Sequence, residues 1–312
     1  MSVTHVHVRN CNSNRGVTYG TPLERQFATY VNRNVQCLSR KNSREGDAPL
    51  VEFPKDYTEL IRQAHVATQA AREDGKQLLE IEFPVASLAS VQGDEEGANE
   101  MTKSSQYLRQ YARMFVDGAD TTRIFFPDEK EMELQRKDVW EQTKFQLDYL
   151  TRPNGLLDIG LDVSGYDPLS SVSQSETVFI AAYPSFDPRE LVAADKVWSF
   201  AKESEEKTFI FFNAELDRLR SNYYPGLFYP QMTRLRKDMM PMVTPVYYIH
   251  NFKGAGGGVL FRAYPGPWQV LLRVSQDDVV VVHVQDEQPS LKSVALDILP
   301  RAAVEYMKKN NT

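Results

Sequence analysis

Cysteine and long apolar runs are what this sequence has least of. Its 312 residues include two cysteines, Cys11 and Cys37, and both lie near the amino terminus. The rest of the chain therefore has no disulfide framework and no cysteine metal site. No apolar run approaches the roughly 20 residues that a membrane-spanning helix needs, so the sequence predicts a protein without a transmembrane segment.

Several motifs of well-known enzymes are also missing. No predicted strand is followed by G-x-G-x-x-G or by G-x-x-x-x-G-K-[ST], the two glycine loops that cradle phosphates. The histidines lack the H-E-x-x-H spacing of zinc proteases, and there is no G-x-S-x-G nucleophile turn. A net charge of −6 argues mildly against a general nucleic-acid binder, which needs a clustered basic surface. We therefore assign no catalytic residue, no metal ligand and no cofactor, and expect no nucleic-acid partner.

The amino-terminal segment, residues 1–48, differs from the rest in composition. Its first 44 residues hold six arginines and one lysine against a single acid, Glu24, with many Asn, Ser and Thr. Such an Arg-rich, hydroxylated and acid-poor stretch is typical of an organelle transit peptide. A disordered extension without a targeting role has the same composition, so both interpretations stay open. We expect the folded part to be a single domain over residues 53–308.

From Phe53 on, hydrophobic periodicity predicts alternating strands and helices. We expect strands at 78–84, 122–127, 177–184 and 207–213, and helices at 55–74, 101–117, 128 to about 153, and 187–202. The polar stretches 88–100 and 154–175 are predicted to be loops. Asp128 and Asp187 stand where helix-capping aspartates are expected, and Glu131 and Glu190 follow them as capping-box acids. Strands that alternate with helices in this way imply βαβ units and a mostly parallel sheet.

After Asn213 the pattern changes. Residues 217–245 cluster Arg, Tyr, Met and Pro around a short predicted helix at 230–239, and strands follow at 246–252, 258–265, 268–274 and 279–284. Their links are so short that only antiparallel pairing fits. A last helix is expected from about Pro289, with an interruption at Pro300. The predicted fold class is α/β: a mostly parallel, Rossmann-like sheet flanked by helices and extended by a carboxyl-terminal antiparallel meander.

Two groups of residues are candidates for function. Ligands of open α/β sheets usually bind beyond the carboxyl ends of the strands, where Asn213 and Glu215 stand. Basic and aromatic residues follow in a cluster that includes Arg218, Arg220, Tyr223 and Tyr224. These residue types are enriched in protein interfaces, and they also suit anionic lipid headgroups. The alternative is a solvated loop whose aromatic residues pack on the sheet.

The segment 254–274 joins a glycine-rich turn, a strand, a Pro-Gly-Pro break and a second strand. Since the glycines precede a strand and not a helix, we interpret them as a hairpin turn and not as a phosphate loop. Arg262 stands in an otherwise apolar strand, so it needs a carboxylate partner if it points inward. Glu215 is one candidate for that partner. Tyr264 and Trp268 of the same hairpin complete the candidate interaction surface.

Three stretches carry a family resemblance: NAELDRLRSNYYPGLFYPQ (213–231), VYYIHNFKG (246–254) and GGVLFRAYPGPWQVLLR (257–273). In them the chain resembles the "domain of unknown function 1995" proteins of plants, algae and cyanobacteria. The best-known plant relatives of that family are the low photosystem II accumulation assembly factors. The resemblance covers about residues 53–300 and is most specific at 256–273.

The resemblance implies a chloroplast protein, stromal or peripheral to the thylakoid, that assists assembly or stability of photosystem II. It would act through protein–protein contacts with photosystem subunits or other assembly factors. The family has no established catalytic residues, so none are carried over. Some of its domains are fused to nucleotide kinases, but this chain lacks the kinase phosphate loop. The alternative from another class is a small-molecule or nucleotide-binding enzyme of unknown reaction, with its site at the carboxyl ends of the parallel strands.

Overall fold

One continuous sheet organises the computed structural model, which describes residues 50–84, 87–90, 97–152, 166–253, 257–275 and 278–310. Its parallel half runs in the order β3 (Gln146–Thr151), β2 (Thr122–Asp128), β4 (Val178–Ala182), β5 (Thr208–Phe212), β1 (Leu78–Glu82) and β6 (Thr244–Phe252). β7 (Gly258–Ala263), β8 (Trp268–Arg273) and β9 (Val279–Gln285) continue it in antiparallel pairing. The predicted fold class is therefore confirmed. The expected transit peptide, residues 1–48, lies outside the described residues.

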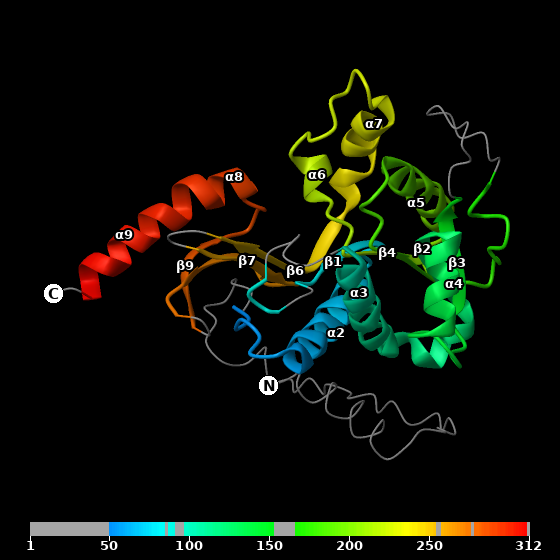
Figure 1. Cartoon of the computed structure of the whole chain (residues 1–312), viewed down its shortest axis with the longest axis horizontal. Helices are drawn as coiled ribbons and strands as arrows, with labels where there is room; N and C mark the ends of the chain where they lie inside the picture. The colour runs from blue at the N-terminus through cyan, green and yellow to red at the C-terminus, as the bar shows by residue number, and fades with distance from the viewer. Residues whose placement is uncertain are drawn as a thin grey trace, which may run out of the picture. The chain divides into compact units, whose positions relative to one another are not determined.

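Helices cover both faces of the sheet (Figure 1). α2 (Tyr57–Glu73), α3 (Gly97–Tyr111), the 3₁₀ segment Ala112–Thr121 and α4 (Glu129–Lys137) contribute to the apolar core of one face. α5 (Pro188–Ala201), α6 (Asp217–Arg220) and α7 (Pro230–Asp238) cover the parallel half of the other face, and α8 (Leu291–Ser293) and α9 (Leu299–Asn310) cover its antiparallel half. Within the described ranges, no helix is long and apolar enough to cross a bilayer.

The predicted helix caps are present. Asp128 accepts a hydrogen bond from the backbone N–H of Glu131 at 2.9 Å, and Asp187 accepts one from that of Arg189 at 2.9 Å. Each cap satisfies an amide that the first helical turn leaves without a partner. Glu131 itself does not complete a capping box, because its carboxylate accepts hydrogen bonds from Gln135 and from the Tyr183 hydroxyl instead.

The helix predicted from 128 to about 153 is wrong. α4 ends at Lys137, where Asp138 leaves helical geometry with φ −118° and ψ −99°. The chain then turns so that Trp140 and Phe145 both enter the core, with their rings 5.7 Å apart. Residues 146–151 form the parallel edge strand β3, whose Tyr149 and Leu150 pack on opposite faces of the sheet. Burial of two aromatic rings and pairing with β2 outweigh the local helical spacing.

One of the two loop predictions also differs from the structure. α3 begins at Gly97, inside the stretch 88–100 that we predicted to be a loop. Residues 166–175 contain turns, as expected, while 154–165 lie outside the described part of the chain.

Edge strand β3 is held by a buried arginine. Arg123 of β2 donates from Nε and Nη2 to Glu176 at 2.9 and 2.7 Å, and from Nη1 to Asp148 of β3 at 2.9 Å. A further bond from Nη2 reaches the Ser171 carbonyl at 2.8 Å. Burial alone would lower the pKa of Arg123, but its two carboxylate partners outweigh burial and raise it. The cation therefore ties two strands and the 171–176 segment together.

The antiparallel half depends on a glycine in the predicted hairpin. A Cβ atom at Gly258 would lie 2.2 Å from the carbonyl oxygen of Leu271 and 2.5 Å from a methyl carbon of Leu299. Gly258 is thus required because strands and helix approach closely there, and not because of a positive φ. Residues 254–256 of the glycine-rich turn lie outside the described residues. The interruption expected at Pro300 takes the form of a π-helical turn, Val294–Ile298, directly before α9.

Candidate functional site

β1 carries two glutamates into the protein interior. Its residues alternate in direction, so Leu79 and Ile81 join the α2–α3 core while Glu80 and Glu82 point to the opposite face, towards α6. Glu80 is fully buried and Glu82 is 3 % exposed. Fully buried acids are rare unless they are paired, so this strand marks an unusual site.

Arg220 of α6 neutralises Glu80. Its Nη1 donates to Glu80 at 2.8 Å and lies 3.3 Å from Asp217, and its Nη2 donates to the second Glu80 oxygen. Tyr248 of β6 donates its hydroxyl proton to Asp217. The four side chains, Glu80, Arg220, Asp217 and Tyr248, join β1, α6 and β6, and we call them the buried charge cluster.

Burial and charge shift the pKa values in this cluster in opposite directions. Burial raises the pKa of Glu80, while Arg220 opposes that shift. Burial would lower the pKa of Arg220, but Glu80 and Asp217 outweigh it and raise the value. Burial, and then the charges of Glu80, Glu215 and Asp217, hold the pKa of Glu82 well above its usual range. Glu82 therefore favours its protonated form beside the ion pair.

The predicted ligand-binding residues, Asn213 and Glu215, follow the carboxyl end of β5. Asn213 is buried, and its amide accepts from the Phe83 N–H at 2.7 Å and donates to the Ser104 hydroxyl at 3.2 Å. Glu215 is paired with Arg218, whose Nη2 lies 2.5 Å away and whose Nη1 donates to the Ser185 carbonyl at 2.7 Å. These contacts link strand ends to α3 and α6, so the polar groups already have protein partners.

Arg262 lies on β7 and is stacked against aromatic rings. Its guanidinium carbon is 5.8 Å from the Tyr264 ring centre and 5.4 Å from that of Trp268, and its Nε donates to the Gly266 carbonyl at 3.3 Å. It forms no ion pair with Glu215, the partner that the sequence suggested, because Glu215 is bound to Arg218. Burial lowers the pKa of Arg262. Trp268 is a core residue at 1 % exposure.

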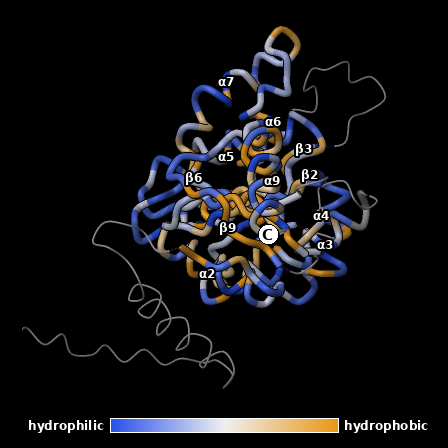
Figure 2. The backbone as a smooth tube through the Cα atoms, turned by 90° about the vertical axis from the view of Figure 1, so that its left-hand side faces the viewer, coloured by the Kyte–Doolittle hydropathy of each residue, from blue (hydrophilic) through white to orange (hydrophobic). Residues whose placement is uncertain are grey.

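The segment between α6 and α7, residues 221–229, projects from the molecule, and we call it the tip loop (Figure 1). Exposure reaches 67 % at Tyr223, 88 % at Leu227 and 74 % at Phe228, and Figure 2 shows apolar colour at the top of this loop. Within the loop, Tyr224 is buried and contacts the Tyr223 and Tyr229 rings edge-on. The backbone N–H groups of Phe228 and Tyr229 both donate to the Pro225 carbonyl at 3.0 Å. The tip loop is therefore an ordered turn that presents apolar side chains to solvent.

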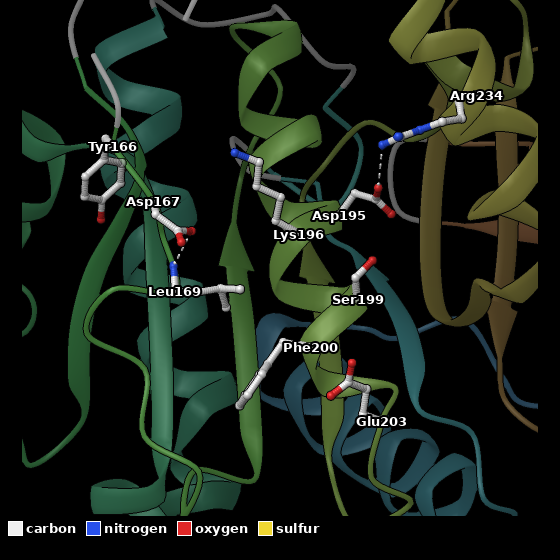
Figure 3. Close-up of a pocket in the computed structure, with 9 residues that line it drawn as sticks. All are labelled: Tyr166, Asp167, Leu169, Asp195, Lys196, Ser199, Phe200, Glu203 and Arg234. Carbon is white, nitrogen blue, oxygen red and sulfur yellow. Dashed lines mark hydrogen bonds and ion pairs between the residues drawn. The ribbon is translucent and has the colours of Figure 1, made fainter. Parts of the chain in front are cut away.

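A shallow groove of about 630 Å³ lies between α5, α7 and the segment 166–169 (Figure 3). Its polar groups are largely used within the protein: Arg234 lies 3.1 Å from Asp195, and Asp167 accepts from the Leu169 N–H at 3.0 Å. Lys196 of α5 and Glu203, which follows α5, add charges of opposite sign. The groove thus offers mixed, exposed charge and no set of groups aimed at one ligand. Across the described ranges, no group of three or more His, Cys, Asp or Glu side chains is placed to hold a metal ion.

A buried acid at the start of α5 predicts a pH-dependent stability. The Glu190 carboxylate accepts from the Phe186 N–H at 3.2 Å, and burial, followed by the charges of Asp187 and Asp128, raises its pKa to about 8. The unfolded chain loses this proton at lower pH than the folded one, so ionisation of Glu190 weakens folding as pH rises towards 8. Between pH 6 and 8 the free energy of unfolding should fall by on the order of 2 kcal/mol less in Glu190→Gln than in the wild type, because glutamine does not ionise.

Urea denaturation at the two pH values measures this loss. Glu203→Gln, at an exposed position just after the same helix, serves as a control and should retain the wild-type pH dependence. Equal pH dependence in wild type and Glu190→Gln would contradict the assignment.

A family model, the domain of unknown function DUF1995, matches residues 54–296. The chain belongs to this family. No curated protein and no solved structure matches the sequence. The match spans most of the DUF1995 chain, including the buried charge cluster and the tip loop.

The structure separates the sequence-predicted site residues of this DUF1995 protein into three environments. Arg220 and Tyr224 are largely buried, Arg218 and Tyr223 lie at the surface, and Asn213 and Trp268 are structural core residues. Sequence analysis missed Glu80 and Glu82, although an acid pair within the apolar strand LLEIEFP was the available signal. It also missed Asp217 and Tyr248 as partners, because their contacts join segments far apart in the chain.

Proposed function

We propose that this protein is a non-enzymatic chloroplast factor that assists assembly or stability of a photosynthetic complex, photosystem II, by holding a protein partner with its tip loop. Residues 1–48 would act as the transit peptide, and the protein would work in the stroma or at the thylakoid periphery. The observation that carries the proposal is the projecting tip loop with its exposed Tyr223, Leu227 and Phe228. Exposed apolar clusters of this kind are typical of interaction sites.

The chemistry of the tip loop favours a protein partner. No charged residue occurs from Ser221 to Thr233, and the cores of protein interfaces are depleted in charge and enriched in aromatic residues. The loop begins where Arg220 is fixed to the fully buried Glu80, and the Tyr223 N–H donates to the Arg218 carbonyl at 3.0 Å. An ordered loop loses less conformational entropy on binding than a disordered one, which improves affinity.

Capture from detergent-solubilised thylakoids tests this function. We expect the full chain to recover photosystem II subunits and the double variant Leu227→Ser, Phe228→Ser to bind them at least about 30-fold more weakly, as two hot-spot residues would. Leu134→Ser is the matched control, because Leu134 is 58 % exposed on α4, on the opposite face. Recovery of no photosystem II subunit, or equal recovery by the double variant, would refute the proposal.

A second candidate is a small-molecule or nucleotide-binding enzyme at the carboxyl ends of the parallel strands. One observation favours it: Tyr183, Asn213 and Glu215, which follow β4 and β5, all have positive φ, at 38°, 49° and 49°. Strained non-glycine backbone gathers at active sites. A thermal-shift screen with nucleotides and metabolites separates the candidates. A ligand that raises the melting temperature of wild type but not of Glu215→Gln supports the enzyme, and the absence of any such ligand removes it.

A further inference from the structure

The two edges of the sheet are protected to different degrees. At one edge, Tyr166 stacks on Tyr149 of β3 with ring centres 4.4 Å apart, and its hydroxyl donates to the Tyr149 carbonyl at 3.0 Å. Asp148 adds a charge on the same strand. At the other edge, β9 pairs only with β8 among the described strands. Natural proteins usually guard such an edge with charge, proline or a covering segment.

The sequence of β9 contains no charged residue and no proline that would protect this edge. Its residues, VVVVHVQ, include no Lys, Arg, Asp, Glu or Pro. Val280, Val281 and Val284 are 40–42 % exposed, so both the outer edge and part of each face are in contact with solvent. An apolar edge strand of this kind is a template for pairing with another strand.

The helix that covers this part of the sheet, α9, also has exposed apolar side chains. Leu299, in the first turn of α9, is buried against β7 and β8, whereas Val304 and Met307 further along are 47 % and 55 % exposed. Met307 lies eight residues after Leu299, so the helix advances about 12 Å between them. This distance exceeds two strand spacings of about 4.8 Å each. In Figure 1 the carboxyl-terminal end of α9 lies farther to the left than β9, beyond this edge of the sheet.

We propose that β9 and α9 form a homodimer interface, in which a second copy of this chain pairs β9 with β9 and packs α9 against α9. A lone strand from another protein would complete only the sheet layer and leave Val304 and Met307 exposed. A second copy of the chain supplies both a strand and a helix. A twofold axis between the two copies makes their β9 strands antiparallel. This inference goes beyond the proposed function, because it concerns a surface remote from the tip loop and does not depend on photosystem II.

Light scattering and analytical ultracentrifugation of the full chain over a concentration series provide the test. We expect a species of twice the 35.7 kDa chain mass. The double variant Val281→Lys, Val284→Lys should weaken the dimer at least about tenfold, because like charges then meet across the paired strands. Met307→Glu, on the helix and exposed in the single chain, should also weaken it, and Val116→Lys, 56 % exposed on the 3₁₀ segment, should not.

Circular dichroism shows whether each variant is folded. If the strand variant Val281→Lys, Val284→Lys does not fold, Met307→Glu still tests the interface. A wild-type protein of single-chain mass at every concentration would overturn the proposal. A dimer that neither variant weakens would also overturn it, because the contact would then lie elsewhere. A dimer that only the strand variant weakens would show that the helices do not take part, which contradicts the two-layer arrangement.

Discussion

Replacing Arg123 with methionine is expected to lower the free energy of unfolding by about 3–5 kcal/mol, because the change leaves two buried carboxylates without their cation. Asp148 and Glu176 both accept hydrogen bonds from the Arg123 guanidinium, and all three side chains are at most one-tenth exposed. Methionine retains most of the apolar volume of arginine, so the decrease in the free energy of unfolding comes from the missing charge and hydrogen bonds. Urea denaturation measures it, with far-UV circular dichroism as the signal.

The matched control lies on the same edge of the sheet. Arg152 is 49 % exposed and its Nε stands 4.0 Å from Glu129. Arg152→Met should lower the free energy of unfolding far less than Arg123→Met does, as exposed ion pairs contribute little. If Arg123→Met is no more destabilising than Arg152→Met, the buried ion network does not hold edge strand β3 in the way described.

Arg220→Met is expected to destabilise the protein by a similar amount, about 3–5 kcal/mol, because Glu80 is left fully buried beside a side chain without charge. Glu80→Gln should partly rescue it, since a neutral amide needs no counter-charge. The double variant should therefore be more stable than Arg220→Met alone, and the difference from additivity measures the coupling between the two residues. Denaturant titration of all four proteins completes the cycle.

Arg218→Met is the control for Arg220→Met, because it removes a positive charge from the same helix, α6, without leaving a fully buried acid unpaired. The Arg218 side chain is 42 % exposed, so Arg218→Met should cost less than about 1 kcal/mol. Arg220→Met should in addition weaken capture of the partner by the tip loop, because the loop starts at this residue. Strictly additive Glu80 and Arg220 variants would contradict a direct ion pair.

Local sequence patterns predicted most of the sheet because its strands are apolar and bounded by clear signals. Phe126-Pro127 and Tyr183-Pro184 mark strand ends, Asp128 and Asp187 start helices, and short links after Phe252 require antiparallel pairs. β3 was missed because no glycine or proline stands between Lys137 and Gln146 to end the predicted helix. Only its pairing with β2 and the bond from Arg123 to Asp148 define it as a strand.

The candidate site was harder to predict from the sequence, because its oppositely charged partners are far apart in the chain and come together only in the folded protein. Arg220 belongs to an Arg- and Tyr-rich cluster that we interpreted as an interaction surface or, alternatively, a solvated loop. Its partner Glu80 comes from a strand far away in the chain. We expected a carboxylate partner for Arg262 if it points inward, but its contacts are with two aromatic rings and a carbonyl oxygen. Composition identifies such residues as unusual, while only tertiary structure shows which of them meet.

The position of β1 in the sheet has a consequence for the order of folding. Among the described strands β1 is the first to be synthesised, but it lies between β5 and β6. Its Leu78 aligns with Phe209 and its Leu79 with Thr244. Glu80 can meet Arg220 only after α6 has been made. Pairing of such distant segments has a large loop-closure cost and slows folding. During synthesis the central strand must therefore wait, with its apolar residues and its two acids unpaired, until most of the domain has left the ribosome.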